Sequence, residues 1–195
     1  MYKIDGDGLI LVANKTQAAP QPQAIELTRE ARLIEAVRQG DEQAFAELYS
    51  LFSPMVHAIM LARVPFIEVD DLVQDVFLTA FRRISTLRDE NAFGGWLAMI
   101  ARNRAMDFYR QRRETEELHE SIALHSQSES DAEAARVLQL IRELPEAYRE
   151  TLIMRLVEGM TGPEIAARTG LTAASVRVNL HRGMKLLREK LGVEK

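Results

Sequence analysis

Three carboxylates lie within one short segment of the chain and could together bind a divalent cation. Asp70, Asp71 and Asp75 supply the oxygen ligands that Mg²⁺ prefers, and a bound Mg²⁺ would make the chain a candidate hydrolase. The sequence offers no glycine-rich phosphate loop, no evident catalytic base and no second carboxylate cluster to complete such a site. We therefore favour a binding role without cofactor or metal, and a helical metal-dependent hydrolase is the enzymatic alternative.

Composition excludes several further classes of site. The sequence contains no cysteine, so disulfides, thiolate zinc sites and cysteine nucleophiles are excluded. The four histidines are scattered and form no metal-ligand pair at helical spacing. The apolar run from Leu9 to Ala13 is too short for a signal sequence or a membrane span. We expect a protein of the cytoplasm that does not insert into membranes.

The segment from Met160 to Leu191 could read DNA. Thr161 and Glu164 are placed to form a capping box at the start of one helix, and Gly170 supplies a left-handed residue at its end. Thr172 then caps a second helix. Two helices joined by a glycine turn are typical of a helix-turn-helix unit, whose second helix lies in the major groove.

The second of these helices has an apolar side and a side with basic and small polar residues. The residues expected to contact DNA are Ser175, Arg177, Val178, His181, Arg182 and Lys185. A guanidinium can bond guanine bidentately, and other basic groups can hold phosphates. A surface helix could carry the same charge for solubility, so the caps, the turn and the apolar periodicity together favour DNA binding.

Charge is distributed unevenly along a chain whose formal net charge is −4. The segment from Val76 to Arg113 carries eight arginines and three carboxylates, and the segment from Thr172 to Leu191 carries five basic residues and one glutamate. Between them, Glu114 to Arg136 carries seven carboxylates and one arginine. This pattern predicts two basic bodies joined by a solvated acidic linker.

No segment alternates apolar and polar residues with the period of a strand, so the sequence predicts an all-α fold of two small helical domains. Thr28 and Asp41 are expected helix caps, and Gly40 is an expected helix stop. Pro54 should kink or divide the helix that follows Asp41. The expected parts are a mobile tail (1–26), a first domain (27–113), a flexible acidic linker (114–133) and a second domain (134–195).

A helix from about Val69 to Ile84 should bury one side and expose an acidic side. The residues expected to be buried are Leu72, Val73, Val76, Phe77, Ala80 and Phe81. The residues expected on the exposed side are Asp71, Gln74, Asp75, Leu78 and Arg82. The helix dipole also favours acidic residues in a first turn, so this surface alone does not distinguish a docking site from a structural preference.

The loop from Ser85 to Asn91 leads into a long helix from Phe93 to Arg113 that combines aromatic residues with arginines. Phe93 and Trp96 are expected to pack in the core in preference to stacking on bases, because aromatic residues on helices usually pack. The arginines can reach a phosphate backbone, and the loop can hold an unstacked base. This half of the chain is a second candidate nucleic-acid site.

Four blocks in this order and spacing resemble one family. They are DDLVQDVFLTAFR, F-x-x-W-L followed by ARNRAMDFYR, LPEAYRETLIMRLVEGMTGPEIA, and SVRVNLHRGMKLL. Over roughly Arg32 to Leu191 the chain resembles the bacterial extracytoplasmic-function (ECF, group four) sigma factors of the sigma-70 family. The resemblance implies a non-enzymatic specificity subunit of RNA polymerase, with conserved region 2 in the first domain and region 4 in the second.

The resemblance also implies roles for individual residues. Those expected to dock on the clamp of the largest subunit of core RNA polymerase are Asp70, Asp71, Gln74 and Asp75. Those expected to contact the promoter −10 element, with the loop holding its flipped base, are Arg88, Asp89, Asn91, Phe93, Trp96, Arg102, Asn103 and Arg110. The six residues listed above for the second helix would contact the −35 element, while Leu144 and Pro145 would lie near the flap of the second-largest subunit.

A further partner that the resemblance implies is an anti-sigma factor, which would hold the chain inactive by covering its polymerase-binding surfaces, while the flexible linker lets the two domains close on each other. Val178 and Asn179 depart from the small polar and basic residues that are common in the family, so the −35 sequence is expected to differ. The alternative outside the family is a self-sufficient helix-turn-helix regulator, which would dimerise on a palindromic duplex without polymerase.

Overall fold

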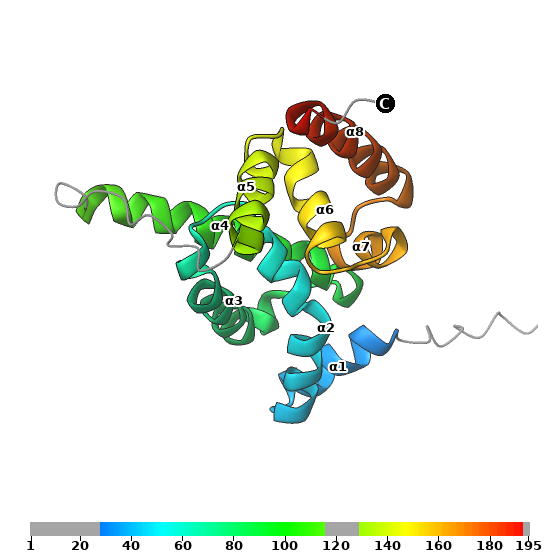
Figure 1. Cartoon of the computed structure of the whole chain (residues 1–195). Coiled ribbons are helices and arrows are strands. Elements are labelled where there is room, and N and C mark those ends of the chain that lie inside the picture. The colour runs from blue at the N-terminus through cyan, green and yellow to red at the C-terminus, as the bar shows by residue number, and fades with distance from the viewer. Residues whose placement is uncertain (1–27, 116–128, 193–195) are drawn as a thin grey trace, which may run out of the picture.

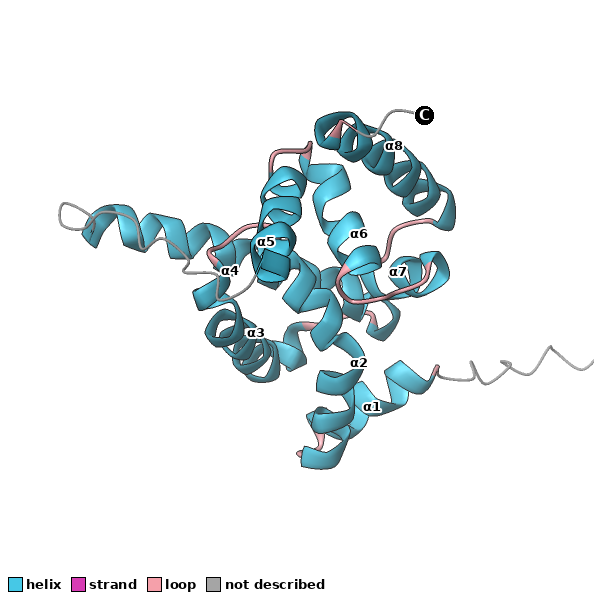
Figure 2. Cartoon of the chain, in the orientation of Figure 1, coloured by secondary structure: helices cyan, strands magenta, loops and turns pink. Residues whose placement is uncertain are grey.

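The computed structural model describes residues 28–115 and 129–192 (Figure 1), and within these ranges the chain is helical without strands (Figure 2). The all-α prediction is confirmed. The expected tail (1–26) and most of the expected linker (114–133) lie outside the described residues, although α4 extends to Thr115 and α5 begins at Glu129.

The first domain consists of four helices and the short 3-10 turns between them. The helices are α1 (Arg29–Arg38), α2 (Glu42–Leu61), α3 (Val69–Arg83) and α4 (Phe93–Thr115). The 3-10 turns are Phe66–Glu68, Ile84–Thr86 and Glu90–Ala92. Helix α2 is central, because it packs against α1, α3 and α4.

Local sequence signals set the ends of the first helices. The Thr28 side chain accepts a hydrogen bond from the backbone N–H of Ala31, and Asp41 caps α2 through Gln43 and Ala44. Gly40 lies between the two helices with φ of 89°, a left-handed conformation that favours glycine. The three predicted punctuation residues are therefore confirmed.

Helix α2 continues through Pro54, so of the two predicted outcomes, a kink or a division, the division does not occur. Proline removes one backbone donor, but Phe52, Met55 and Val56 on either side are buried in the core and hold the helix together. By length and composition, α2 is the one described helix that could span a membrane. Its burial against three other helices accounts for its apolar character instead.

The predicted buried side of α3 is confirmed except at its end. Leu72, Val76 and Ala80 are buried with the other predicted residues, but Phe81 is 43% exposed. The ring of Phe81 contacts Phe45 with a centroid distance of 5.0 Å. Only one side of the ring is covered, because Phe81 lies in the last turn of α3 at the edge of the buried stripe.

The second domain consists of α5 (Glu129–Arg142), α6 (Glu146–Leu156), α7 (Gly162–Thr169) and α8 (Ala173–Leu191). Thr161 and Glu164 form the predicted capping box, Gly170 ends α7 with φ of 73°, and Thr172 caps α8. Helices α7 and α8 both pack against α6. The predicted helix-turn-helix unit is thus present as α7 and α8.

The two domains pack directly against each other. Helices α6 and α7 contact α2, and α7 also contacts α4. Ile141, Leu152 and Ile153 of the second domain belong to the same buried cluster as Phe52 and Ile59 of the first. These packing contacts join the two domains into one body (Figure 1), in which residues far apart in sequence share a core.

Gly183 lets α8 approach α6 closely. A Cβ atom at this buried position would lie 2.9 Å from Leu152 Cδ1 and 3.1 Å from Tyr148 Cβ. We expect Gly183→Val to lower the free energy of unfolding by about 1–3 kcal/mol more than Arg182→Val, because overpacking a core displaces its neighbours. Urea unfolding of both variants measures the difference. Equal stability of the two would contradict the close packing, since valine replaces an exposed side chain in the control.

Candidate nucleic-acid and polymerase interface

The predicted DNA-reading residues share the exposed side of α8. Val176, Gly183 and Leu187 are buried toward α6 and the core. The opposite side is exposed and presents Ser175, Arg177, Val178, His181, Arg182 and Lys185. The side chain of Thr172 accepts a hydrogen bond from the Ser175 N–H at 3.1 Å, which anchors the first turn of this helix. The second domain thus holds a basic, solvent-facing helix at the position that a helix-turn-helix uses for the major groove.

The acidic start of α3 is also exposed. Asp70, Asp71 and Gln74 face solvent, and the Asp75 carboxylate accepts hydrogen bonds from Arg104 of α4 at 2.7 and 3.2 Å. Leu78 is 51% exposed one turn further on, so together with Phe81 it adds an apolar part to this surface. An exposed surface with acidic and apolar parts suits a protein partner.

These carboxylates do not gather around a common point. Across residues 28–115 and 129–192, no three histidine, aspartate or glutamate side chains lie close enough together to hold a metal ion. Asp75 turns instead toward the guanidinium of Arg104. The magnesium-dependent alternative therefore has no site in the described part of the chain.

The loop between α3 and α4 is held by its own polar contacts. Asp89 accepts a hydrogen bond from the Asn91 N–H at 3.0 Å, and Glu90 pairs with Arg38 of α1. A hydrogen bond from its own backbone and the pair with Arg38 lower the pKa of Glu90. Arg88, Asp89 and Asn91 keep their side chains exposed, as the predicted −10 role requires.

The aromatic residues that follow the loop differ in exposure. Phe93 is 3% exposed and packs edge-on against Phe52 at a centroid distance of 4.9 Å, so the expectation of a direct DNA contact at Phe93 conflicts with its position. The buried ring of Phe93 holds the first turn of α4 against the core. Trp96 is partly exposed and lies 5.8 Å from the Phe93 ring, which leaves part of the indole accessible.

The polar residues of α4 have different surroundings. Asn103 and Arg110 are exposed, and Arg110 pairs with Asp107 one turn earlier at 2.9 Å. Arg102 instead reaches toward the second domain, with 37% of its side chain exposed. Its Nε and Nη2 donate to the two oxygens of Glu150 at 3.1 and 2.7 Å, and these bonds raise the pKa of Arg102.

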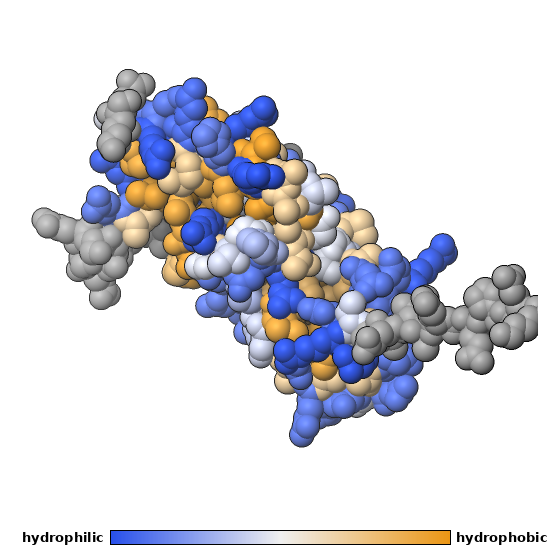
Figure 3. Space-filling view, turned by 90° about the vertical axis from the view of Figure 1, so that its right-hand side faces the viewer, coloured by the Kyte–Doolittle hydropathy of each residue, from blue (hydrophilic) through white to orange (hydrophobic). Residues whose placement is uncertain are grey.

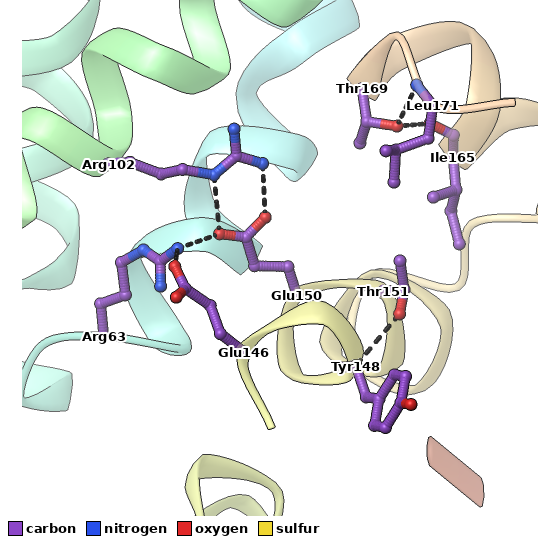
Figure 4. Close-up of polar contacts among 9 residues, drawn as sticks. All are labelled: Arg63, Arg102, Glu146, Tyr148, Glu150, Thr151, Ile165, Thr169 and Leu171. Atoms are coloured by element: carbon purple, nitrogen blue, oxygen red, sulfur yellow. Dashed lines mark hydrogen bonds and ion pairs between the residues drawn. The ribbon is translucent and has the colours of Figure 1, made fainter. Parts of the chain in front are cut away.

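Glu150 is the centre of an ion-pair network between the domains (Figure 4). Its side chain is 10% exposed, and it receives Arg102 from α4 and Arg63 from the end of α2, the latter at 2.6 Å. Arg63 also pairs with Glu146 at 2.5 Å. Three elements therefore converge on one carboxylate that the sequence analysis did not identify, because nothing in its local sequence distinguishes it from a solvated glutamate on α6.

Three further contacts join the domains. Arg142 of α5 donates to the backbone carbonyls of Leu61 and Val64, both at 2.8 Å, and burial lowers the pKa of Arg142. His57 Nδ1 of α2 lies 2.6 Å from a carboxylate oxygen of Glu158, and Arg168 of α7 pairs with Glu30 at 3.0 Å. Arginine and glutamate side chains thus connect α5, α6 and α7 to the first domain.

Two family models match the chain in the positions of the two domains. The model described as Sigma-70 region 2 matches residues 48–115, and the model described as Sigma-70, region 4 matches residues 134–187. Among curated proteins, RNA polymerase sigma factor CarQ of Myxococcus xanthus is 30% identical over 166 residues, which are 82% of this chain and 95% of that protein. The ECF RNA polymerase sigma-E factor of Escherichia coli (strain K12) is 30% identical over 82% of this chain and 92% of its own length.

The chain belongs to the ECF sigma factor family. ECF sigma factor SigW of Bacillus subtilis (strain 168) is 26% identical over 81% of the chain and 94% of its own length. Among solved structures, CnrH in complex with the cytosolic domain of CnrY has 26% identity and a TM-score of 0.58, covering 85% of this chain and 99% of CnrH. Sigma factor RpoE of Bartonella quintana, solved with the anti-sigma factor NepR, has 22% identity and a TM-score of 0.54 over 78% of this chain and 99% of RpoE, and shows the same fold.

Membership of the family confirms the resemblance drawn from the four sequence blocks. The sigma factor therefore acts in transcription initiation, and its two family regions coincide with the two groups of exposed residues described above. Region 2 contains α3 and α4 with the loop between them, and region 4 contains α7 and α8.

The pair of His57 and Glu158 makes the stability of this sigma factor depend on pH. The hydrogen bond to Glu158 raises the pKa of His57, with a further contribution from the charge of Asp70 and an opposing effect of burial. The stabilisation is complete below the unfolded-state pKa of about 6.5 and is lost as pH rises through the higher folded-state pKa. We expect urea unfolding to show this loss in the wild type and a flatter profile in Glu158→Gln.

The matched control for this measurement is Glu133→Gln, which changes an exposed glutamate of α5. Its pH profile should follow the wild type. The pair would be refuted by an NMR titration in which the His57 imidazole titrates at the same pH in the wild type and in Glu158→Gln.

Proposed function

We propose that this sigma factor binds core RNA polymerase in the cytoplasm and directs it to promoters through two DNA contacts, without catalysis of its own. The observation that carries the proposal is the arrangement of the region 4 domain. Six residues whose chemistry suits DNA contacts share the exposed side of α8, and this helix follows a capped α7 and a glycine turn in the sequence. We place region 2 within 27–113 and region 4 within 134–195, joined by the acidic segment from Glu114 to Glu133.

We infer that the exposed part of α3 docks on the clamp of the largest polymerase subunit. Asp70, Asp71 and Gln74 are fully accessible, and Asp75 is half-exposed beside Arg104. The exposed Leu78 extends this surface with the apolar contact area that protein interfaces bury. Interaction with a basic helical surface would use these acidic residues as the orienting charges and the apolar side chain for affinity.

A second protein-binding surface lies on region 4. Large apolar side chains there are 36 to 53% exposed, namely Leu156, Val157, Leu171 and Leu191. Figure 3 shows hydrophobic surface gathered over the upper part of the molecule, where α6, α7 and α8 lie. We expect the flap of the second-largest subunit, or an anti-sigma factor, to bind here. The structural relative CnrH was itself solved with a protein bound, the cytosolic domain of CnrY.

Each DNA contact has a distinct chemistry. On α8, Arg177 and Arg182 have the donors for guanine or phosphate, while Val178 has the methyl groups that contact thymine. In region 2, we infer that the −10 strand meets the loop residues Arg88 and Asp89, with a base taken up beside Trp96. Each contact alone would be weak and salt-dependent, but mounting both on one polymerase makes the second contact intramolecular.

Polymerase binding is tested by a pair of double variants with matched chemistry. Asp71→Ala/Gln74→Ala should weaken binding to core polymerase by about tenfold or more, because we place both residues among the minority of interface residues whose truncation costs about 1 kcal/mol or more. Glu42→Ala/Gln43→Ala removes the same side-chain types from the exposed first turn of α2 and should leave binding unchanged. Titration with labelled core polymerase measures both. Equal affinities would place the clamp contact elsewhere.

Promoter reading is tested with the holoenzyme on fragments of genomic DNA, selected by the discrete transcripts they yield. Arg182→Ala should lower promoter affinity by about 5- to 150-fold if it contacts a base, or reduce the salt slope by about one if it contacts a phosphate. Arg188→Ala removes an exposed arginine from the last turns of the same helix and is the control. Tight binding of the free chain to a palindromic duplex, with no polymerase requirement, would favour the stand-alone regulator instead.

A further inference from the structure

A hollow of about 850 Å³ lies where α5 meets the end of α2, the turn before α3 and the C-terminal part of α4. Both domains line it: Phe66 and Tyr109 come from region 2, and Arg142 and Arg149 come from region 4. Pockets that bind small ligands measure about 300–1,000 Å³ and combine apolar walls with a few polar groups. We call it the α4–α5 hollow, and none of the polymerase or DNA contacts proposed above lies in it.

Arg142 places a partly buried positive charge in the wall of this hollow. Its bonds from Nε and Nη2 to the carbonyl oxygens of Leu61 and Val64 fix the guanidinium in position. No carboxylate of residues 28–115 and 129–192 pairs with it, and burial without such a partner lowers the pKa of Arg142. Because a buried charge without a counter-ion is costly, an anion that reaches its Nη1 donors would be bound favourably.

Arg149 adds a second guanidinium to the lining of the hollow. Its Nε donates to the carbonyl oxygen of Leu144, and its two terminal nitrogens have no acceptor in the described part of the chain. Two carboxylates also line the hollow, but Glu143 pairs with Lys190 at 2.7 Å, which leaves only Glu68 to oppose the two guanidinium groups. Guanidinium groups with unused terminal donors match the geometry of a phosphate group.

Region 2 contributes exposed aromatic rings to the same hollow. Phe66 is 57% exposed and Tyr109 is 43% exposed. The Tyr109 hydroxyl donates to the carbonyl oxygen of Arg63 at 2.8 Å, which fixes the ring while much of its surface stays accessible. An exposed aromatic ring can stack on any nucleobase, because every base has a π-face.

The two kinds of side chain together distinguish a nucleotide from simpler ligands. Free phosphate would use the guanidinium groups and leave the aromatic rings exposed to water. An uncharged aromatic compound would cover the rings and leave the guanidinium groups without an anion. A nucleotide carries both a planar base and phosphate groups, so it satisfies both parts of the hollow at once.

We propose that the α4–α5 hollow binds a nucleotide, with its phosphate groups at Arg142 and Arg149 and its base against Tyr109 and Phe66. The ligand bridges the two domains, because region 4 holds its phosphates and region 2 holds its base. Backbone carbonyls fix Arg142 and Tyr109 before any ligand arrives, and preorganised groups lose less conformational freedom on binding. The site is additional to the proposed contacts with polymerase and promoter and does not depend on them.

Equilibrium dialysis of the full chain against radiolabelled ATP tests the proposal without polymerase or promoter DNA. We expect saturable binding of one ATP per chain. Adenosine carries only the base and sugar, and pyrophosphate carries only the anion. Each should therefore bind at least about tenfold more weakly than ATP.

Arg149→Gln tests the phosphate part of the site. It should lower the affinity for ATP by about 10- to 150-fold, the range for loss of one charged hydrogen bond, and leave the affinity for adenosine unchanged. The matched control is Arg155→Gln. Arg155 is an exposed arginine of the same helix that also donates to a backbone carbonyl, that of Met160, but it does not line the hollow. This control should bind ATP as the wild type does.

Tyr109→Leu tests the base part of the site. It should lower the affinities for ATP and for adenosine alike by about 5- to 150-fold, because one base–aromatic stack is lost. Tyr109→Phe keeps the ring and should keep ATP binding, although the bond to Arg63 is removed. Tyr49→Leu changes a similarly exposed tyrosine outside the hollow and is the control. Circular dichroism verifies that each variant is folded.

Several results would overturn the inference. A folded wild-type chain that takes up no ATP at millimolar concentration would show that the hollow is not a nucleotide site. Wild-type affinity in both Arg149→Gln and Tyr109→Leu would place bound ATP elsewhere on the chain. Pyrophosphate that binds as tightly as ATP would indicate an anion site without base recognition, and an oligoadenylate that binds more tightly than ATP would assign the hollow to a nucleic-acid strand. None of these outcomes bears on the proposed function, since the assay contains neither polymerase nor promoter.

Discussion

The carboxylate of Glu150 is buried where the two halves of this sigma factor meet, so its negative charge must be balanced by positively charged side chains. The relative position of the two domains depends on which side chains do this. Glu150 lies on α6 of region 4, yet both of its guanidinium partners, Arg63 and Arg102, belong to region 2. Removing one member of such a buried network typically costs 3–5 kcal/mol, because the remaining charge is left unpaired. The network is therefore selective: it favours one relative position of the domains over others.

Neutralisation of Glu150 has a consequence for DNA binding. Arg102 donates from Nε and Nη2 to Glu150, so the −10 contact that we propose for Arg102 would require it to release these donors from Glu150. The exposed side of α8 has no such conflict, since Arg177, His181 and Arg182 face solvent. The two proposed DNA contacts thus differ in availability, because only the proposed −10 residue Arg102 is engaged by the other domain.

The sigma factor uses its apolar surface in two ways. Ile141, Leu152 and Ile153 are buried in a core that continues from region 2 into region 4. Leu78, Phe81 and Val157 stay exposed at the edges, where a larger partner can cover them. A chain with small domains gains stability by sharing a core between them, and the apolar surface left outside that core is available for the polymerase contact that we propose.

Local features of the sequence determined the helices, their ends and the exposed, basic side of α8. Caps at Thr28, Asp41, Thr161 and Thr172 act within three residues, and apolar periodicity acts within one helix, so both can be read without knowledge of the fold. Family membership was likewise legible from four sequence blocks, because their order and spacing are properties of the chain itself.

Only the tertiary structure decided which side chains of region 2 are exposed and which are buried or bonded to another helix. Phe93 belongs to the core because Phe52 comes from another helix to cover it, and Phe81, in the last turn of α3, is partly exposed. Continuity of α2 through Pro54 depends on burial that local propensity does not encode. Glu150 acquires its significance from a partner 48 residues away, at Arg102. Such contacts arise from packing between distant segments, which neither residue type nor local spacing specifies.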